Sequence, residues 1–200
     1  MRAEIGELAA EHVTLVLIAL AIAIAIAVPA GILVTRRAAW RTGVLGFASV
    51  MQTIPSLALF GFLIPIPFIG GIGRRTAIVA LVLYALLPIL RNTLVGILGV
   101  DAAVRESAVA MGMAPRQILW QVEIPLAART ILAGIRIATV TTIGTATIAA
   151  AIGGGGLGVF IFRGIASVDA GQILAGAIPA ACMALAADGI LGLLERRLAV

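Results

Sequence analysis

Few side chains in this chain could perform chemistry, and their types exclude several reactions. The 200 residues include one His, one Cys and no Lys, since all fourteen basic residues are Arg. A phosphate-binding loop of the form Gly-x-x-x-x-Gly-Lys-Ser/Thr is therefore impossible, so the chain cannot hydrolyse ATP through one. No nucleophile–His–acid set or carboxylate cluster for a metal is present, and we do not expect an enzyme. If the chain performs a process that requires ATP hydrolysis, a separate subunit must hydrolyse the ATP.

One stretch, Glu106 to Pro125, has a pattern suited to binding a partner protein. Asp101 precedes an Ala- and Val-rich segment as a helix N-cap, and Gly112 suits the left-handed position past a helix end. Pro115 predicts the first turn of a second short helix, which we expect to end at Pro125. Apolar residues then share one face of this helix and polar residues the other: Ile118, Leu119 and Val122 against Arg116, Gln117 and Gln121. The pattern predicts a compact knob that fits a cleft on a partner.

The spacing within this stretch resembles a known family motif. Seven residues carry the resemblance: Glu106, Ser107, Ala108, Gly112, Val122, Ile124 and Pro125. They are similar to the EAA loop of permease subunits of bacterial ABC importers, which reads Glu-Ala-Ala, a Gly, then Ile-x-Leu-Pro, with Ser107 in place of the first Ala. The resemblance implies that the loop couples the permease to a cytoplasmic ATPase, which would bind the ATP and Mg²⁺, and that this chain binds no cofactor. If the loop docks, Ala108 is expected to face the ATPase, where a larger group would hold the two subunits apart. The alternative is an amphipathic loop that only caps a helix bundle and tolerates a substitution at Gly112.

The elements that must position this loop are membrane helices. Hydrophobic residues make up 62% of the chain, and the mean hydropathy is +1.19, which is typical of an integral membrane protein. Several apolar runs are long enough to span about 30 Å of hydrocarbon, and they predict an all-α bundle of about five transmembrane helices. The predicted spans are 13–34, 44–64, 76–98, 130–152 and 170–194. The coupling loop is expected at 99–129, between the third and fourth spans. We expect residues 65–73 to form a surface or re-entrant connection and the glycine run at 153–158 to form a hinge.

Polar side chains inside these spans are candidates for a translocation pathway or gate. They are Gln52, Thr53, Pro55 and Ser56 in the second span and Thr142 and Thr145 in the fourth. Polar groups at this depth usually face the interior of a bundle. The other interpretation is helix packing through small and polar residues.

The ionisable groups within the spans favour pairing over a proton relay. Arg91, Arg136 and Asp188 all lie toward the inner ends of their helices, whereas a proton-driven transporter keeps such groups deep in the membrane. We expect Asp188 to neutralise Arg91 or Arg136. His12 is interpreted as an interfacial residue, and the lone Cys182 excludes an intrachain disulfide. A stand-alone secondary transporter or channel remains the alternative function.

Further runs are similar to permeases for glycine betaine, carnitine or choline: Gln52 to Gly61, Leu83 to Thr93, and Ile143 to Gly158. This resemblance covers about Val13 to Leu194 and implies a type I ABC importer permease in a bacterial plasma membrane. It also implies three kinds of partner, namely a second permease subunit that is identical or homologous, an ATPase dimer and an extracytoplasmic solute-binding protein. Quaternary ammonium groups are commonly held by aromatic cages, and the aromatic residues here are few and scattered, so selection of the solute is expected to belong to the binding protein.

The distribution of Arg predicts the topology. Ten of the fourteen Arg residues fall on one side of a five-span arrangement: Arg36, Arg37, Arg41, Arg91, Arg105, Arg116, Arg129, Arg136, Arg196 and Arg197. Because cytoplasmic loops carry the excess of basic residues, this side is expected to be cytoplasmic. The C-terminus and the EAA-like loop would then lie inside and the N-terminus outside.

A labelling experiment checks this topology. In a Cys182→Ala background, a single Cys at Ala3 should react with a membrane-impermeant thiol reagent added outside intact cells, because the segment before Val13 is expected to be extracytoplasmic. A probe at Arg197 should react only after the membrane is opened. Labelling of the Ala3 probe only after opening would rule out the five-span arrangement.

Overall fold

A computed structural model describes residues 2–198, and every regular element in this range is helical. The elements are α1 Arg2–Arg36, α2 Ala38–Thr53, α3 Ser56–Leu63, α4 Arg74–Leu98, α5 Ala102–Ala110, α6 Pro115–Ile118, the π-helix η1 Leu119–Glu123, α7 Ile124–Ala146, the 3-10 helix η2 Ile148–Ile152, α8 Gly158–Ser167 and α9 Ala170–Arg197. Four helices are long and apolar enough to cross a membrane, or five if the bent pair α2–α3 counts as one span. The expected all-α bundle is confirmed.

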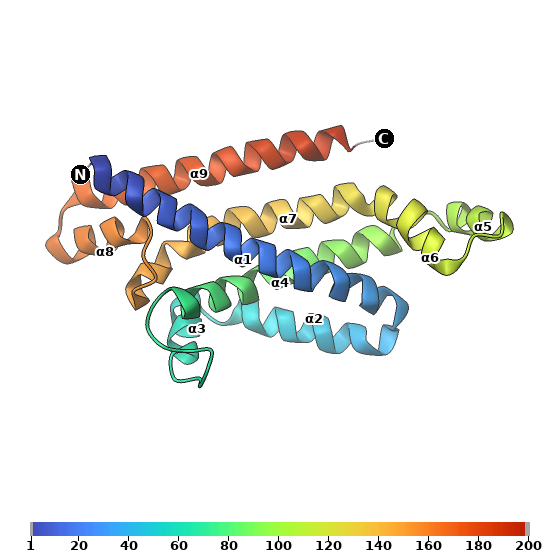
Figure 1. Ribbon diagram of the computed structural model, residues 1–200, viewed down its shortest axis with the longest axis horizontal. Coiled ribbons are helices and arrows are strands. Elements are labelled where there is room, and N and C mark those ends of the chain that lie inside the picture. Colours follow the sequence, from blue (N-terminus) through green and yellow to red (C-terminus); the bar gives the residue numbers. More distant parts are fainter. Residues whose placement is uncertain (1, 199–200) are drawn as a thin grey trace.

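Helix α4 lies at the centre of the bundle. It packs against α1 on one side and α7 on another, and α9 in turn packs on α7 (Figure 1). Small side chains permit this closeness, since Ala19, Ala23 and Ala27 of α1 are completely buried. Gly134 of α7 lies so near α4 that a Cβ there would be 2.7 Å from the Pro88 carbonyl oxygen. Close backbone approach at small residues is typical of membrane helices, because lipid provides no hydrophobic force between them.

The two chain ends point to opposite ends of the bundle. The N-terminal end of α1 lies beside α8, whereas the C-terminal end of α9 points toward the end from which α5 and α6 project (Figure 1). Helix α1 crosses the bundle between these ends. The knob predicted at Glu106–Pro125 therefore lies at the opposite end of the bundle from the start of α1.

The second predicted span, 44–64, is sharply bent and is not one continuous helix. Helix α2 ends at Thr53, Ile54 is extended with φ −65° and ψ 128°, and α3 starts at Ser56, at an angle of 104° to α2. The cause is Pro55, because a residue before proline disfavours the helical conformation. The hydroxyl of Tyr84 on α4 donates a hydrogen bond to the Ile54 carbonyl, which satisfies a backbone group left by the break.

Two further predicted boundaries are wrong around the fourth span, 130–152. The helix that starts at Pro115 does not end at Pro125 but runs through η1 into α7, so the apolar helix extends over Pro115–Ala146. Pro125 lies in the first turn after the π-helix, where a widened turn can accommodate the missing N–H and the ring. At the other end α7 stops at Ala146, and residues 148–152 form the 3-10 helix η2.

The glycine run that follows η2 is bound by the start of α1. Gly155 and Gly156 both have positive φ, and the Gly156 N–H donates to the Glu11 carboxylate at 3.1 Å. Glu11 also forms an ion pair with Arg74. His12 is completely buried against Gly156, with Nε2 3.1 Å from the Ile143 carbonyl oxygen. The folded glycine run therefore covers His12, which the sequence places at the edge of the first apolar run.

An ion pair joins α7 to α9. Arg136 Nε and Nη2 each donate to a different oxygen of Asp188 at 2.7 Å, and Nη1 lies 3.2 Å from Glu195 Oε2. Such a bidentate geometry is among the strongest for a guanidinium and a carboxylate. The expectation that Asp188 neutralises Arg91 or Arg136 is confirmed for Arg136.

This pair can be tested by mutation. Asp188→Ala should lower the yield of folded, monodisperse protein in detergent, because Arg136 then keeps only Glu195 as a partner. Adding Arg136→Met should restore part of the yield, since it removes the charge left without its main partner. Adding Arg91→Met instead serves as the control and should restore nothing. Rescue by Arg91→Met, or none by Arg136→Met, would contradict the assignment.

Candidate functional site

Local side-chain and backbone hydrogen bonds shape the knob of α5 and α6. The Asp101 carboxylate caps α5 by accepting from the Ala103 N–H at 2.8 Å. Gly112 has φ +77°, and the next N–H, that of Met113, returns to the Ala108 carbonyl at 3.2 Å. The Gln117 side chain accepts from the Ala114 N–H at 2.8 Å and so begins α6. The predicted cap, left-handed glycine and Pro115 start are all confirmed by this geometry.

The three residues that correspond to Glu-Ala-Ala point in different directions. Glu106 and Ser107 are exposed on α5, and the Ser107 hydroxyl donates back to the Ala103 carbonyl at 2.8 Å. Ala108, by contrast, is buried within this chain. The expectation that Ala108 faces the ATPase is wrong for the free subunit, since a larger group there would first collide with the chain's own fold.

The free surface of the knob is apolar at its tip. Val109 is 62% exposed and Met111 is 73% exposed, and both lie in the part of the chain that projects beyond the ends of α4 and α7 (Figure 1). Exposed apolar side chains that gather on a structured loop indicate a protein contact. Apart from its two chain neighbours, no atom of the described residues lies within 4 Å of a Cβ built on Gly112, so this turn also faces open space.

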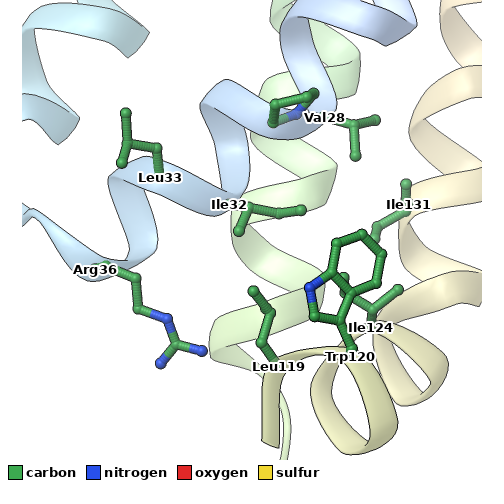
Figure 2. A pocket seen from close by; sticks show the side chains of 9 residues that line it. Val28, Ile32, Leu33, Arg36, Leu119, Trp120, Ile124 and Ile131 are labelled. Carbon is green, nitrogen blue, oxygen red and sulfur yellow. The ribbon is translucent and has the colours of Figure 1, made fainter. Parts of the chain in front are cut away.

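The second part of the knob packs back on the bundle. Val122 and Ile124 are half-buried and Pro125 is exposed. Ile124 helps to line a cavity of about 440 Å³ between the end of α1 and the start of α7, whose other walls include Val28, Ile32, Trp120 and Ile131. Figure 2 shows these side chains converging, with Arg36 at one edge. The only charged group among the lining residues is therefore at the rim of an apolar groove.

Sequence reasoning missed Glu123, which lies between the motif residues Val122 and Ile124. This side chain is only 1% exposed. Its carboxylate accepts a hydrogen bond from Arg36 at the end of α1 and lies 3.0 Å from Nε of Arg105 on α5. The available signal was an acidic residue on the apolar side of an amphipathic helix, since a carboxylate buried there requires a cationic partner.

The candidate pathway residues occupy two environments. Gln52, Thr53 and Pro55 are exposed in the single subunit, and Ser56 is half-buried at the start of α3. Gln52, Thr53 and Pro55 therefore do not lie in the interior of the single subunit. Thr142 is buried, and its hydroxyl has no hydrogen-bond partner among the described residues. Thr145 is half-buried, shortly before η2, against which α3 packs. The structure thus brings α3 toward the end of α7 but does not bury Gln52 there.

These features define a class of protein, a helical membrane protein with a folded loop that projects from one end of the bundle. Residues 23–200 match the family described as "Binding-protein-dependent transport system inner membrane component", so the chain belongs to this family and is a multi-pass inner-membrane permease subunit of an ABC importer.

The chain is similar to several curated permeases. It is 44% identical over 188 residues to the choline transport system permease protein OpuBB of Bacillus subtilis, covering 94% of this chain and 85% of the relative. It is 50% identical over 171 residues to the carnitine transport permease protein OpuCB of Listeria monocytogenes, covering 86% and 77%. The alternative of a stand-alone secondary transporter or channel has no support in these relatives.

A solved structure shares the fold. A chain of the MetNI methionine ABC transporter, from inward-facing conformations in the CY5 native crystal form, aligns with a TM-score of 0.89 and 22% identity and covers 100% of this chain and 98% of that one. At this identity the likeness concerns the fold alone, and it confirms the predicted type I importer architecture.

Proposed function

We propose that this permease carries a quaternary ammonium osmoprotectant such as glycine betaine, carnitine or choline, and that a separate ATPase drives it through the knob of α5 and α6. The solute class is supported by the names of similar permeases, including the glycine betaine/carnitine/choline permease OpuCB of Bacillus subtilis, 44% identical over 195 residues. The docking site is supported by one observation above all: the exposed Val109 and Met111 lie on a capped knob that projects from the bundle.

The same proposal assigns the other components. ATP and Mg²⁺ would bind to the ATPase dimer, because this chain has no Lys for a phosphate-binding loop. A second permease subunit, identical or homologous, would cover the exposed polar residues of α2 and complete the pathway. A solute-binding protein would deliver the solute at the end where α1 begins, which the Arg distribution places outside the membrane.

The coupling role predicts the effect of Gly112→Asp. A side chain at φ +77° is strained and projects from a turn that would enter the ATPase groove, so docking should weaken. Copurification of the ATPase, solute-stimulated ATP hydrolysis and uptake in reconstituted vesicles should all fall about tenfold, the effect of roughly 1.4 kcal/mol of lost binding free energy. The yield of folded permease should stay near that of the unmodified protein.

Gly71→Asp is the matched control. Gly71 also has positive φ, +110°, and a Cβ there would likewise contact nothing within 4 Å, but it lies in the connection between α3 and α4, away from the knob. It should leave copurification of the ATPase unchanged. If Gly112→Asp kept normal stimulation and uptake, the knob would be a cap of the bundle and would not transmit ATPase movement.

A further inference from the structure

Glu123 joins four elements at the knob end of the bundle. It belongs to η1, and its two arginine partners come from the last residue of α1 and from α5. Arg105 also donates a hydrogen bond to the carbonyl of Ile97, near the end of α4. A single buried carboxylate thus connects the knob with both α1 and α4. We refer to Glu123, Arg36 and Arg105 as the Glu123 clamp.

The π-helix explains how an acidic residue reaches this position. A π-turn contains one residue more than an α-turn, so it rotates the following side chains relative to a regular helix. In this turn Glu123 points into the protein while Gln121 and Pro125 remain exposed. A buried carboxylate is costly unless cations and hydrogen bonds satisfy it, and the two arginines meet that requirement. The π-turn therefore places Glu123 where both arginines reach it.

The N-terminal end of α1 is also bound to other elements, namely the glycine run at 153–158 and α8. There Glu11 accepts the Gly156 N–H at 3.1 Å, and Glu4 lies 2.5 Å from Arg163 of α8. Between Glu11 and Arg36 the chain is one continuous helix that contains Pro29, and at about 1.5 Å per residue it reaches roughly 38 Å. Helix α1 is thus held at the knob by Arg36 and at the glycine run by Glu11.

We propose that Glu123 is a positioning residue for coupling: it fastens the knob to α1, so that displacement of the knob by the ATPase also displaces α1 and, through Glu11, the glycine run. This inference rests on the proposed docking of an ATPase. A purely structural ion pair would stabilise the subunit without affecting the amount of solute moved per ATP hydrolysed. The coupling ratio, defined here as solute taken up per ATP hydrolysed, therefore separates the two roles.

Arg36→Gln is the informative variant. It cuts the link to α1 but leaves Glu123 paired with Arg105, so the carboxylate is not stranded and the subunit should fold. Arg37→Gln is the matched control, because it removes the same charge one residue away, from a side chain that stacks over Trp40 with 5.0 Å between its Cζ and the ring centre and does not touch Glu123. Glu123→Gln, which keeps the side-chain size, is the second variant.

The experiment uses the assembled transporter with its ATPase and binding protein in vesicles, and glycine betaine as the probe. In Arg36→Gln and Glu123→Gln, solute-stimulated hydrolysis should persist while the coupling ratio falls about fivefold or more, the lower range of allosteric coupling. Arg37→Gln should keep the normal ratio. An unchanged ratio in Arg36→Gln, a parallel loss of hydrolysis and uptake, or an equal effect of Arg37→Gln would each overturn the inference.

Measurements on the unmodified transporter distinguish failure of this inference from failure of the proposed function. If it shows no stimulated hydrolysis and no copurifying ATPase, the docking proposal itself is wrong. If it couples hydrolysis to uptake and the clamp variants couple equally well, docking stands and only the role of Glu123 is rejected.

Discussion

A membrane leaves no water to satisfy backbone N–H and C=O groups, and the rest of this structure depends on that constraint. Long helices satisfy it within themselves. At three positions where a helix ends or the chain is irregular, a side chain from another element supplies a partner: Tyr84 for the Ile54 carbonyl, Glu11 for the Gly156 N–H and Arg105 for the Ile97 carbonyl. Each break is thereby also a contact between elements far apart in sequence, so the irregular positions hold the bundle together.

The sequence predicts those elements whose signals are local. The cap at Asp101, the left-handed Gly112 and the start at Pro115 follow from short-range rules, and all three are correct. The predictions failed where local rules conflict with tertiary context. Pro125 is a helix breaker in an α-turn and is accommodated after a π-turn, and a π-turn has no sequence signature of its own.

Buried polar groups also separate into those that the sequence predicts and those that it does not. An ion pair between Asp188 and an Arg could be expected because both charges lie at similar depth in apolar helices. The partners that cover Glu123 and His12 could not, since they come from elements distant in the chain: the glycine run covers His12, and arginines from α1 and α5 cover Glu123. A periodic pattern identifies which face of a helix is apolar, but it does not identify which segment covers a polar residue on that face.

The exposed polar residues of α2 limit which surfaces can face lipid. Gln52 and Thr53 lie uncovered at the end of α2, beside the bend to α3. The Thr53 hydroxyl is satisfied by the Val50 carbonyl at 2.8 Å, so Thr53 could face lipid at little cost. The primary amide of Gln52 has two donors and an acceptor, and exposing it to hydrocarbon would cost several kcal/mol. The Gln52 amide is therefore better satisfied against another subunit or water than in hydrocarbon, which agrees with the proposal that a second permease subunit covers α2.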